Sequence, residues 1–255
     1  MVRLRFGILG IVCASFLFTQ QQAEAKTITF AADSWCPVNC APGSERPGYM
    51  VEIVEAILEP KGYDVRYVNV NWSRALLYAR SGRFDAVLGA LKGDAPDFVF
   101  PAEPQGETEI GIFVPKSSSW QYTSEASLKD KRIGLIRDYA YGEELERHIR
   151  LQAHPTYAGG EHPLKINMLQ LKVGRIDMIV EDVGVFRHTA RELGLDKEFR
   201  LAKTFSREHI YAAFSPGNPA STRLAQMLST GMRDLRANGS LRLIMKKYAL
   251  DDWRH

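Results

Sequence analysis

The sequence predicts an α/β protein of two similar lobes that face each other across a cleft. One observation is an internal echo, in which residues 82–90 (GRFDAVLGA) resemble residues 174–182 (GRIDMIVED). In each copy a Gly suited to the end of a helix precedes an apolar run of strand length, which indicates helix, tight turn and buried strand. The other observation is that helix-length and strand-length segments alternate along the chain. Gly and Asp around a strand are common in α/β proteins, so the echo alone does not prove a duplication.

Residues 1–25 are predicted to be a secretory signal peptide, removed before Lys26. Arg3 and Arg5 form a basic end, residues 6–18 an apolar run and residues 23–25 a small-x-small cleavage site. The apolar run is too short for an ordinary membrane span, and no later segment approaches the roughly 18 uncharged residues that a span needs. Cys13 follows Val12, where a lipoprotein site requires a small residue. We therefore expect an unlipidated protein in the periplasm.

Composition argues against a nucleic-acid partner. The chain has 33 Lys and Arg residues and 30 Asp and Glu residues, a formal net charge of +3. Removing the leader brings this balance still closer to neutral, and the basic residues are scattered rather than clustered. The remaining length can bury one large core or two lobes of about 100 residues each.

Two cysteines remain after the leader, Cys36 and Cys40 in the stretch WCPVNC. Close cysteines in an exported chain favour a disulfide, because zinc needs three or four ligands and no His follows at finger spacing. The bond would contribute roughly 2 kcal/mol through loop entropy. Its more important expected effect is to fix the loop that carries Trp35.

The first predicted lobe begins strand, helix, strand. Residues 50–58 have apolar side chains at helical spacing and are followed by Pro60 and Gly62, which end a helix. A second helix from Trp72 stops at Gly82, before the first echo strand. Apolar or alternating runs predict strands at 27–32, 64–69 and 110–114. Pro115 closes the last of these, where we place the first crossing between lobes.

The second predicted lobe has the same alternation, and the chain then returns. Apolar runs predict strands at 132–136 and 154–157 besides the second echo, and helices at 143–151, 163–172 and 183–193. Residues 209–214 are the expected return crossing, and helices at 220–237 and 240–248 suit packing on lobe 1. The predicted division is lobe 1 at 26–114 and 209–255, and lobe 2 at 115–208.

The order of these pieces resembles a known family. The resemblance rests on GYMVEI, WSRAL, GRFDAV, SLKDKRIG, GRIDMIVED and NGSL, at 48–53, 72–76, 82–87, 127–134, 174–182 and 238–241, followed by Ile244 and Tyr248. No piece is diagnostic alone, but their shared order and spacing resemble the family 3 extracellular solute-binding proteins, the amino-acid receptors of ABC importers. The resemblance implies the type II periplasmic binding fold, with two crossover strands and hinge closure on a ligand.

One loop departs from the family pattern. The family's amino-acid binders carry Thr-x-Thr-x-x-Arg after the lobe-1 strand, and its Arg clamps the ligand carboxylate. Here the loop is 91–96 (LKGDAP), with Pro96 at the Arg position. The family's Asp for the ligand amino group aligns with Asp182. A free α-amino acid is therefore doubtful, and an amine-bearing or polyol-like solute is equally open unless Lys92, Arg74 or Arg137 binds a carboxylate.

Ligand contacts are expected where the parallel strands end and at helix starts. Each candidate also has a structural reading, such as packing, helix capping or solvation, and Asp182 is the strongest. The candidates are Trp35, Trp72, Arg74, Leu91, Lys92, Asp94, Asp138, Tyr139, Tyr141, Glu181 and Asp182.

No cofactor, metal or catalytic residue is predicted. His154 and His162 lack a third ligand, and no nucleophile, metalloprotease or phosphate-loop motif occurs. We expect a monomer that delivers a small polar solute, an amino acid or a related amine or carboxylate compound, to an ABC permease at the inner membrane. The alternatives are a dehydratase-like enzyme on the same fold, with Glu181, Asp182 or Asp94 as acid or base, and a ligand-sensing partner of a membrane receptor.

Overall fold

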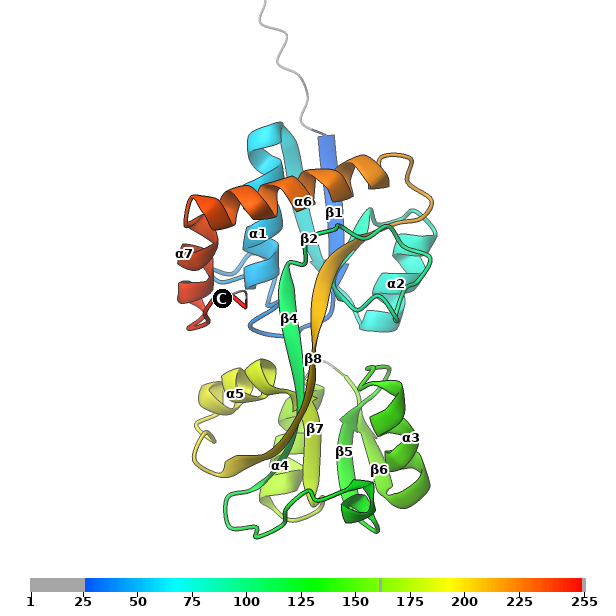
Figure 1. The fold of residues 1–255 in the computed structure, drawn as a ribbon, viewed down its shortest axis with the longest axis vertical. Helices are drawn as coiled ribbons and strands as arrows, with labels where there is room; N and C mark the ends of the chain where they lie inside the picture. The colour runs from blue at the N-terminus through cyan, green and yellow to red at the C-terminus, as the bar shows by residue number, and fades with distance from the viewer. Residues whose placement is uncertain (1–25, 161, 254–255) are drawn as a thin grey trace, which may run out of the picture.

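The computed structural model describes residues 26–160 and 162–253. The predicted signal peptide, with Cys13, lies outside the described residues. The strands follow the order β2-β1-β3-β8-β4-β7-β5-β6. Two long antiparallel strands, β4 (Gly106–Pro115) and β8 (Phe199–Phe214), join two groups of elements, which we call lobe 1 and lobe 2 (Figure 1). The predicted α/β architecture of two lobes with mainly parallel sheets and two crossover strands is confirmed.

Lobe 1 combines the start and the end of the chain. In it β1 pairs in parallel with both β2 and β3, and helices cover the two faces of this sheet. Phe30 and Phe214 are fully buried at its centre, with ring centroids 6.0 Å apart. The elements are β1 (Lys26–Ala32), α1 (Tyr49–Leu58), a 3₁₀ turn (Glu59–Lys61), β2 (Tyr63–Asn69), α2 (Trp72–Arg80), β3 (Ala86–Ala90), α6 (Ser221–Ala237) and α7 (Ser240–Lys247).

Lobe 2 contains the middle of the chain. Here β5 pairs in parallel with β6 and β7, while β7 pairs antiparallel with β4. The core of this lobe packs the apolar faces of the helices on the buried strands. The elements are a 3₁₀ turn (Glu125–Leu128), β5 (Arg132–Ile136), α3 (Glu143–Gln152), β6 (His154–Ala158), α4 (Pro163–Lys172), β7 (Met178–Asp182) and α5 (Val183–Glu192).

The echo forms the same local structure in both lobes. Gly82 and Gly174 have φ values of 75° and 70° after α2 and α4, as the predicted left-handed turn requires. The Asp of each copy accepts a hydrogen bond from the first strand of its lobe, Asp85 from the Thr29 N–H and Asp177 from the Arg132 N–H, both at 2.8 Å. The repeated Gly and Asp are therefore structural, and they fix the strand that leads to the cleft.

The crossing strands are longer than the sequence predicts. A strand is expected at 209–214 but β8 begins at Phe199, and β4 begins at Gly106 rather than at residue 110. Polar side chains interrupt the apolar pattern there, because much of this ribbon is partly or fully exposed to solvent. β4 already pairs with β7 at Ile110, before the predicted boundary at 114, while β8 pairs with β3 from Tyr211. The division at 114 and 209 stays a prediction.

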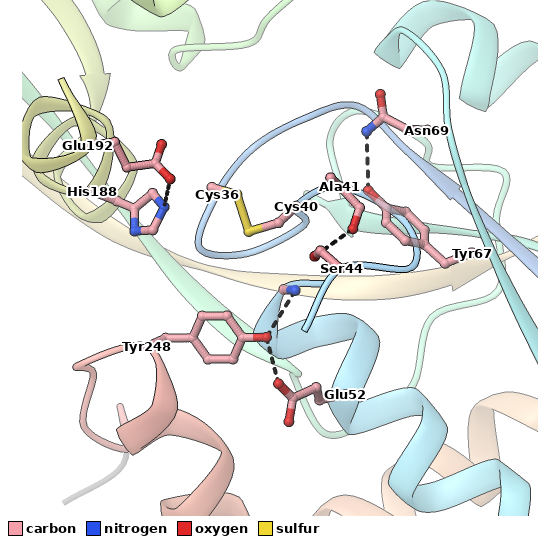
Figure 2. Close-up of a disulfide and its surroundings, with 11 residues drawn as sticks. Cys36, Cys40, Ala41, Ser44, Glu52, Tyr67, Asn69, His188, Glu192 and Tyr248 are labelled. Atoms are coloured by element: carbon pink, nitrogen blue, oxygen red, sulfur yellow. Dashed lines mark hydrogen bonds and ion pairs between the residues drawn. A yellow bond between two sulfur atoms is a disulfide. The ribbon is translucent and has the colours of Figure 1, made fainter. Parts of the chain in front are cut away.

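The predicted disulfide between Cys36 and Cys40 is present, with the Cα atoms 4.8 Å apart. Tyr248, which follows α7, lies beside the start of α1 and near the disulfide loop, as Figure 2 shows. The Tyr248 hydroxyl accepts a hydrogen bond from the Gly48 N–H (3.0 Å) and donates one to Glu52 Oε1 (2.6 Å). These contacts join α7 to the start of α1. Within the described part of the chain, every helix is too short or too polar to cross a membrane.

Candidate ligand-binding site

A pocket with an empty volume of about 540 Å³, its open mouth included, lies between the lobes. Its walls come from the segments that follow β1, β3 and β5, from the end of β7, from the start of α2 and from β4. As expected, the carboxyl ends of the parallel strands meet there. The lining residues are Asp33, Trp35, Trp72, Leu88, Gly89, Leu91, Asp94, Thr108, Ile110, Tyr139, Ala140, Tyr141 and Glu181.

Seven of the eleven predicted ligand contacts line this pocket, and four do not. Those that line it are Trp35, Trp72, Leu91, Asp94, Tyr139, Tyr141 and Glu181. Arg74 and Asp138 are exposed, and Lys92 is exposed with its Nζ 5.2 Å from the centre of the Tyr211 ring. Asp138 does not cap α3 either, because the residue at the N-cap is Gly142. Whether the seven contact a ligand stays a prediction.

Asp182, the strongest candidate from sequence, has a structural role instead. Its Oδ1 accepts the Val185 N–H at 2.8 Å and so caps α5. Its Oδ2 accepts the Thr108 hydroxyl at 2.8 Å and the Glu109 N–H at 2.9 Å, both on β4. The side chain is buried and points at these partners rather than lining the pocket. It fastens the start of α5 to a crossover strand.

Replacing Asp182 by Ala is therefore expected to destabilise the fold. The substitution removes a helix cap and leaves buried N–H and O–H donors without acceptors, a loss of about 2–4 kcal/mol. Urea unfolding of Asp182→Ala measures it, with the exposed Asp196→Ala as the control that changes little. Unchanged stability together with lost ligand binding would instead restore Asp182 as a ligand contact.

Glu181, the neighbouring carboxylate, faces the pocket. Only 1% of its surface is exposed. Its Oε1 accepts the Trp35 indole N–H at 3.3 Å and the Asp182 N–H at 2.8 Å, while its Oε2 has no hydrogen-bond partner among the described residues. Burial raises the pKa of Glu181 from an ordinary 4.5 to about 8, and the negative charges of Asp182 and Asp33 add to the shift.

Asp33 is a lining residue that the sequence analysis missed. It directly follows β1, and burial raises its pKa to about 6, although a hydrogen bond from Tyr139 acts in the opposite direction. A polar residue directly after the predicted strand 27–32 was the available signal, but only Trp35 was selected from that segment. Thr108 was missed because the early start of β4 was not predicted, and Ile110 because its predicted strand was interpreted only as a crossing between lobes.

Two polar contacts cross the cleft directly. The Trp35 indole of lobe 1 donates to Glu181 of lobe 2, and the Tyr139 hydroxyl of lobe 2 hydrogen-bonds to Asp33 of lobe 1. Because each pair joins a segment after β1 to lobe 2, each can form only when the lobes are close together. The structure therefore represents a closed arrangement.

The pocket is aromatic and acidic. Four aromatic side chains line it, Trp35, Trp72, Tyr139 and Tyr141, together with the carboxyl groups of Asp33, Asp94 and Glu181. Among the lining residues that the structure describes, none is Lys, Arg or His. In the loop 91–96, which lacks the family's Arg, Asp94 Oδ2 accepts the Leu91 N–H at 3.1 Å. Burial raises the pKa of Asp94.

Among the described residues, three side chains that could ligate a metal gather outside the cleft. Ligand atoms of Glu125, Glu144 and His148 lie within 4.8 Å of one another at a second cavity. Exposed or half-exposed acidic groups gather in this way in many proteins that bind no metal, and we assign no metal site to them. His154, at the start of β6, and His162, before α4, belong to neither place.

Comparison with protein families gives one match. The model described as "Bacterial extracellular solute-binding proteins, family 3" matches residues 28–251. A comparison with curated proteins gives no match.

Several solved structures share the fold. An ancestral arginine-binding protein bound to arginine has a TM-score of 0.73 at 18% identity, covering 89% of this chain and 99% of its own. A structure from work on glutathione import in Streptococcus mutans has a TM-score of 0.75 at 18% identity, with 88% and 94% covered. A histidine kinase sensor domain similar to periplasmic binding proteins has a TM-score of 0.75 at 23% identity, with 90% and 99% covered.

Proposed function

The chain belongs to family 3 of the bacterial extracellular solute-binding proteins, and we propose that it captures a small polar solute in the periplasm and delivers it to an ABC importer. The observation that carries this proposal is the pocket between the lobes, whose walls come from both. A solute held there contacts lobe 1 and lobe 2 at once. We further propose that the mature protein is a monomer and that the predicted leader directs its export.

Closure of the lobes is the proposed mechanism of capture. The lobes are joined through β4 and β8, so a bend in these two strands opens the cleft. A ligand that touches both lobes binds the closed form better and shifts the population toward it. The contacts from Trp35 to Glu181 and from Asp33 to Tyr139 add to the stability of that form.

Small-angle scattering with calorimetry tests this proposal. The protein is unfolded in denaturant, dialysed to remove any bound solute, refolded and titrated with the solute identified by mass spectrometry of native protein. We expect saturable binding and a smaller radius of gyration. Trp35→Ala should weaken binding at least about tenfold, because a buried aromatic contact and a cross-lobe hydrogen bond are lost. Tyr157→Ala, at a residue 50% exposed outside the pocket, is the matched control. Absence of both binding and closure would overturn the proposal.

An enzyme on this fold is the second candidate, and one observation favours it. A carboxyl group whose pKa is raised by burial to about 8, as for Glu181, suits general acid–base catalysis near neutral pH. NMR of the ligand after prolonged incubation decides between the two functions. Recovery of unchanged ligand supports the receptor, and accumulation of a product supports the enzyme.

A ligand-sensing role is the third candidate. The similarity to a histidine kinase sensor domain shows that this architecture also occurs in a receptor. Co-purification of the liganded protein with a permease or with a signalling receptor separates delivery from sensing.

A further inference from the structure

One carboxyl oxygen of Glu181 has no hydrogen-bond donor among the described residues, and this indicates which group a ligand supplies. Glu181 is 99% buried and lines the pocket, and its Oε2 has no donor within the described part of the chain. Ionising a buried carboxyl group that has an unpaired oxygen costs free energy, and a cationic donor at that oxygen recovers it. The Oε1 atom already accepts two hydrogen bonds and holds the carboxyl group in place. A ligand with an N–H donor would supply the missing hydrogen bond to Oε2.

The charged groups around the pocket favour a donor group that carries a positive charge. Asp33, Asp94 and Glu181 line the pocket, and its described lining includes no basic residue. Arg74 and Arg137 are exposed and outside it, and Lys92 stacks on Tyr211 instead. A carboxylate on the ligand would therefore meet three acidic groups and no basic residue, and each of these groups repels it when ionised. A cation is instead attracted and favours their ionised forms.

The aromatic lining fits a cation as well. Two indoles from lobe 1 and two phenol rings from lobe 2 line the same pocket, and the Tyr139 and Tyr141 ring centroids lie 6.4 Å apart. The faces of such rings carry partial negative charge and attract cations by roughly 0.5–2 kcal/mol each. Aromatic faces and carboxylates together are the usual means of holding an organic ammonium or guanidinium group.

We propose that this pocket binds a small organic cation, with N–H bonds on its charged head and with no carboxylate group. The N–H donates to Glu181 Oε2, and the aromatic side chains of both lobes cover the rest of the molecule. The inference rests on the proposed solute-binding function and names its ligand class.

Binding of a cation is coupled to loss of a proton. The groups that face Glu181 are Trp35 and Asp33 from the segment after β1, Tyr139 and Tyr141 from the segment before α3, and Asp182 beside it. Below pH 8 the free protein holds Glu181 mostly protonated, and the cation favours its ionised form. Affinity should therefore rise with pH, by at most about tenfold per unit from pH 6 to 8, and then level off.

Matched ligand pairs test the inference. Each pair is an amino acid and the amine that remains without its carboxylate: arginine and agmatine, histidine and histamine, phenylalanine and phenethylamine. Trimethylated phenethylamine is added as a cation without any N–H bond. Calorimetry on ligand-stripped protein should show at least one amine binding about 100-fold or more tightly than its parent amino acid, and the trimethylated cation binding no more tightly than phenethylamine. Measurements at pH 6, 7 and 8 follow the proton release.

A pair of variants assigns the effect to the carboxylate. Glu181→Gln keeps the shape but removes the charge, and should weaken the amine about 100-fold and abolish the rise in affinity between pH 7 and 8. Glu143→Gln, at the exposed first residue of α3 and not among the residues that line this pocket, should change neither. Tighter binding of an amino acid or a neutral polyol, with closure of the lobes, would overturn the cation assignment and leave the receptor function intact. Failure of every solute to bind or close the lobes would overturn both.

Discussion

Glu181→Gln is expected to make the ligand-free protein more stable at alkaline pH and to leave its stability unchanged near pH 4. The pKa of Glu181 is about 8 in the folded protein against an ordinary 4.5, so ionisation is easier in the unfolded chain. The wild type therefore loses stability as the pH rises from 4.5 to 8, by at most about 5 kcal/mol for this shift. Glutamine does not titrate and retains an oxygen for the Trp35 and Asp182 donors.

Urea unfolding of wild type and Glu181→Gln at pH 4, 6, 7 and 9 measures the effect. The difference should be near zero at pH 4, grow through pH 6 and 7, and level off above pH 8. Glu143→Gln should match the wild type throughout. Lower stability of Glu181→Gln at every pH would mean that the carboxylate is a structural group. A destabilising buried carboxylate in a pocket is instead typical of a functional site.

Gly48→Ala is expected to cause the largest loss of stability from a single added methyl group, about 3–5 kcal/mol. Gly48 has a φ of 113°, which other residues rarely adopt. A Cβ there would lie 2.4 Å from the Val38 carbonyl oxygen and 2.7 Å from the Asn39 Cα. These are backbone atoms of the disulfide loop, so the clash cannot be relieved by turning a side chain.

Gly43→Ala is the matched control in the same loop. Its φ is 72°, and a Cβ there meets no atom within 4 Å. It should cost only the left-handed backbone strain, about 1–2 kcal/mol. Thermal and urea unfolding of both variants separate the clash from the strain. Equal losses would show that the loop moves away from Gly48 freely.

Gly48→Ala should also weaken ligand binding. The loop packed on Gly48 carries Trp35 into the pocket, and the Gly48 N–H is held by the Tyr248 hydroxyl. A displaced loop moves the indole away from Glu181 and removes a contact across the cleft. Gly43→Ala should leave the ligand affinity unchanged, because nothing packs on that position.

The amino-acid sequence by itself determined the local structure and the order of the elements. Apolar spacing predicted the helices and buried strands, and the Gly and Asp of each echo act locally, through a turn and a hydrogen bond to the adjacent strand. The cysteine spacing predicted the disulfide. These features depend on neighbours in sequence or on one adjacent strand, so residue patterns are sufficient to predict them.

Only the tertiary structure decided which carboxylates face the cleft. Glu181 and Asp182 are adjacent and both buried, yet Asp182 turns to β4 and α5 while Glu181 lines the pocket with Asp33. Successive residues of a strand point to opposite sides, and the position of β4 beside β7 sets which side is the pocket. That position depends on strands far apart in the sequence, and no local pattern contains it.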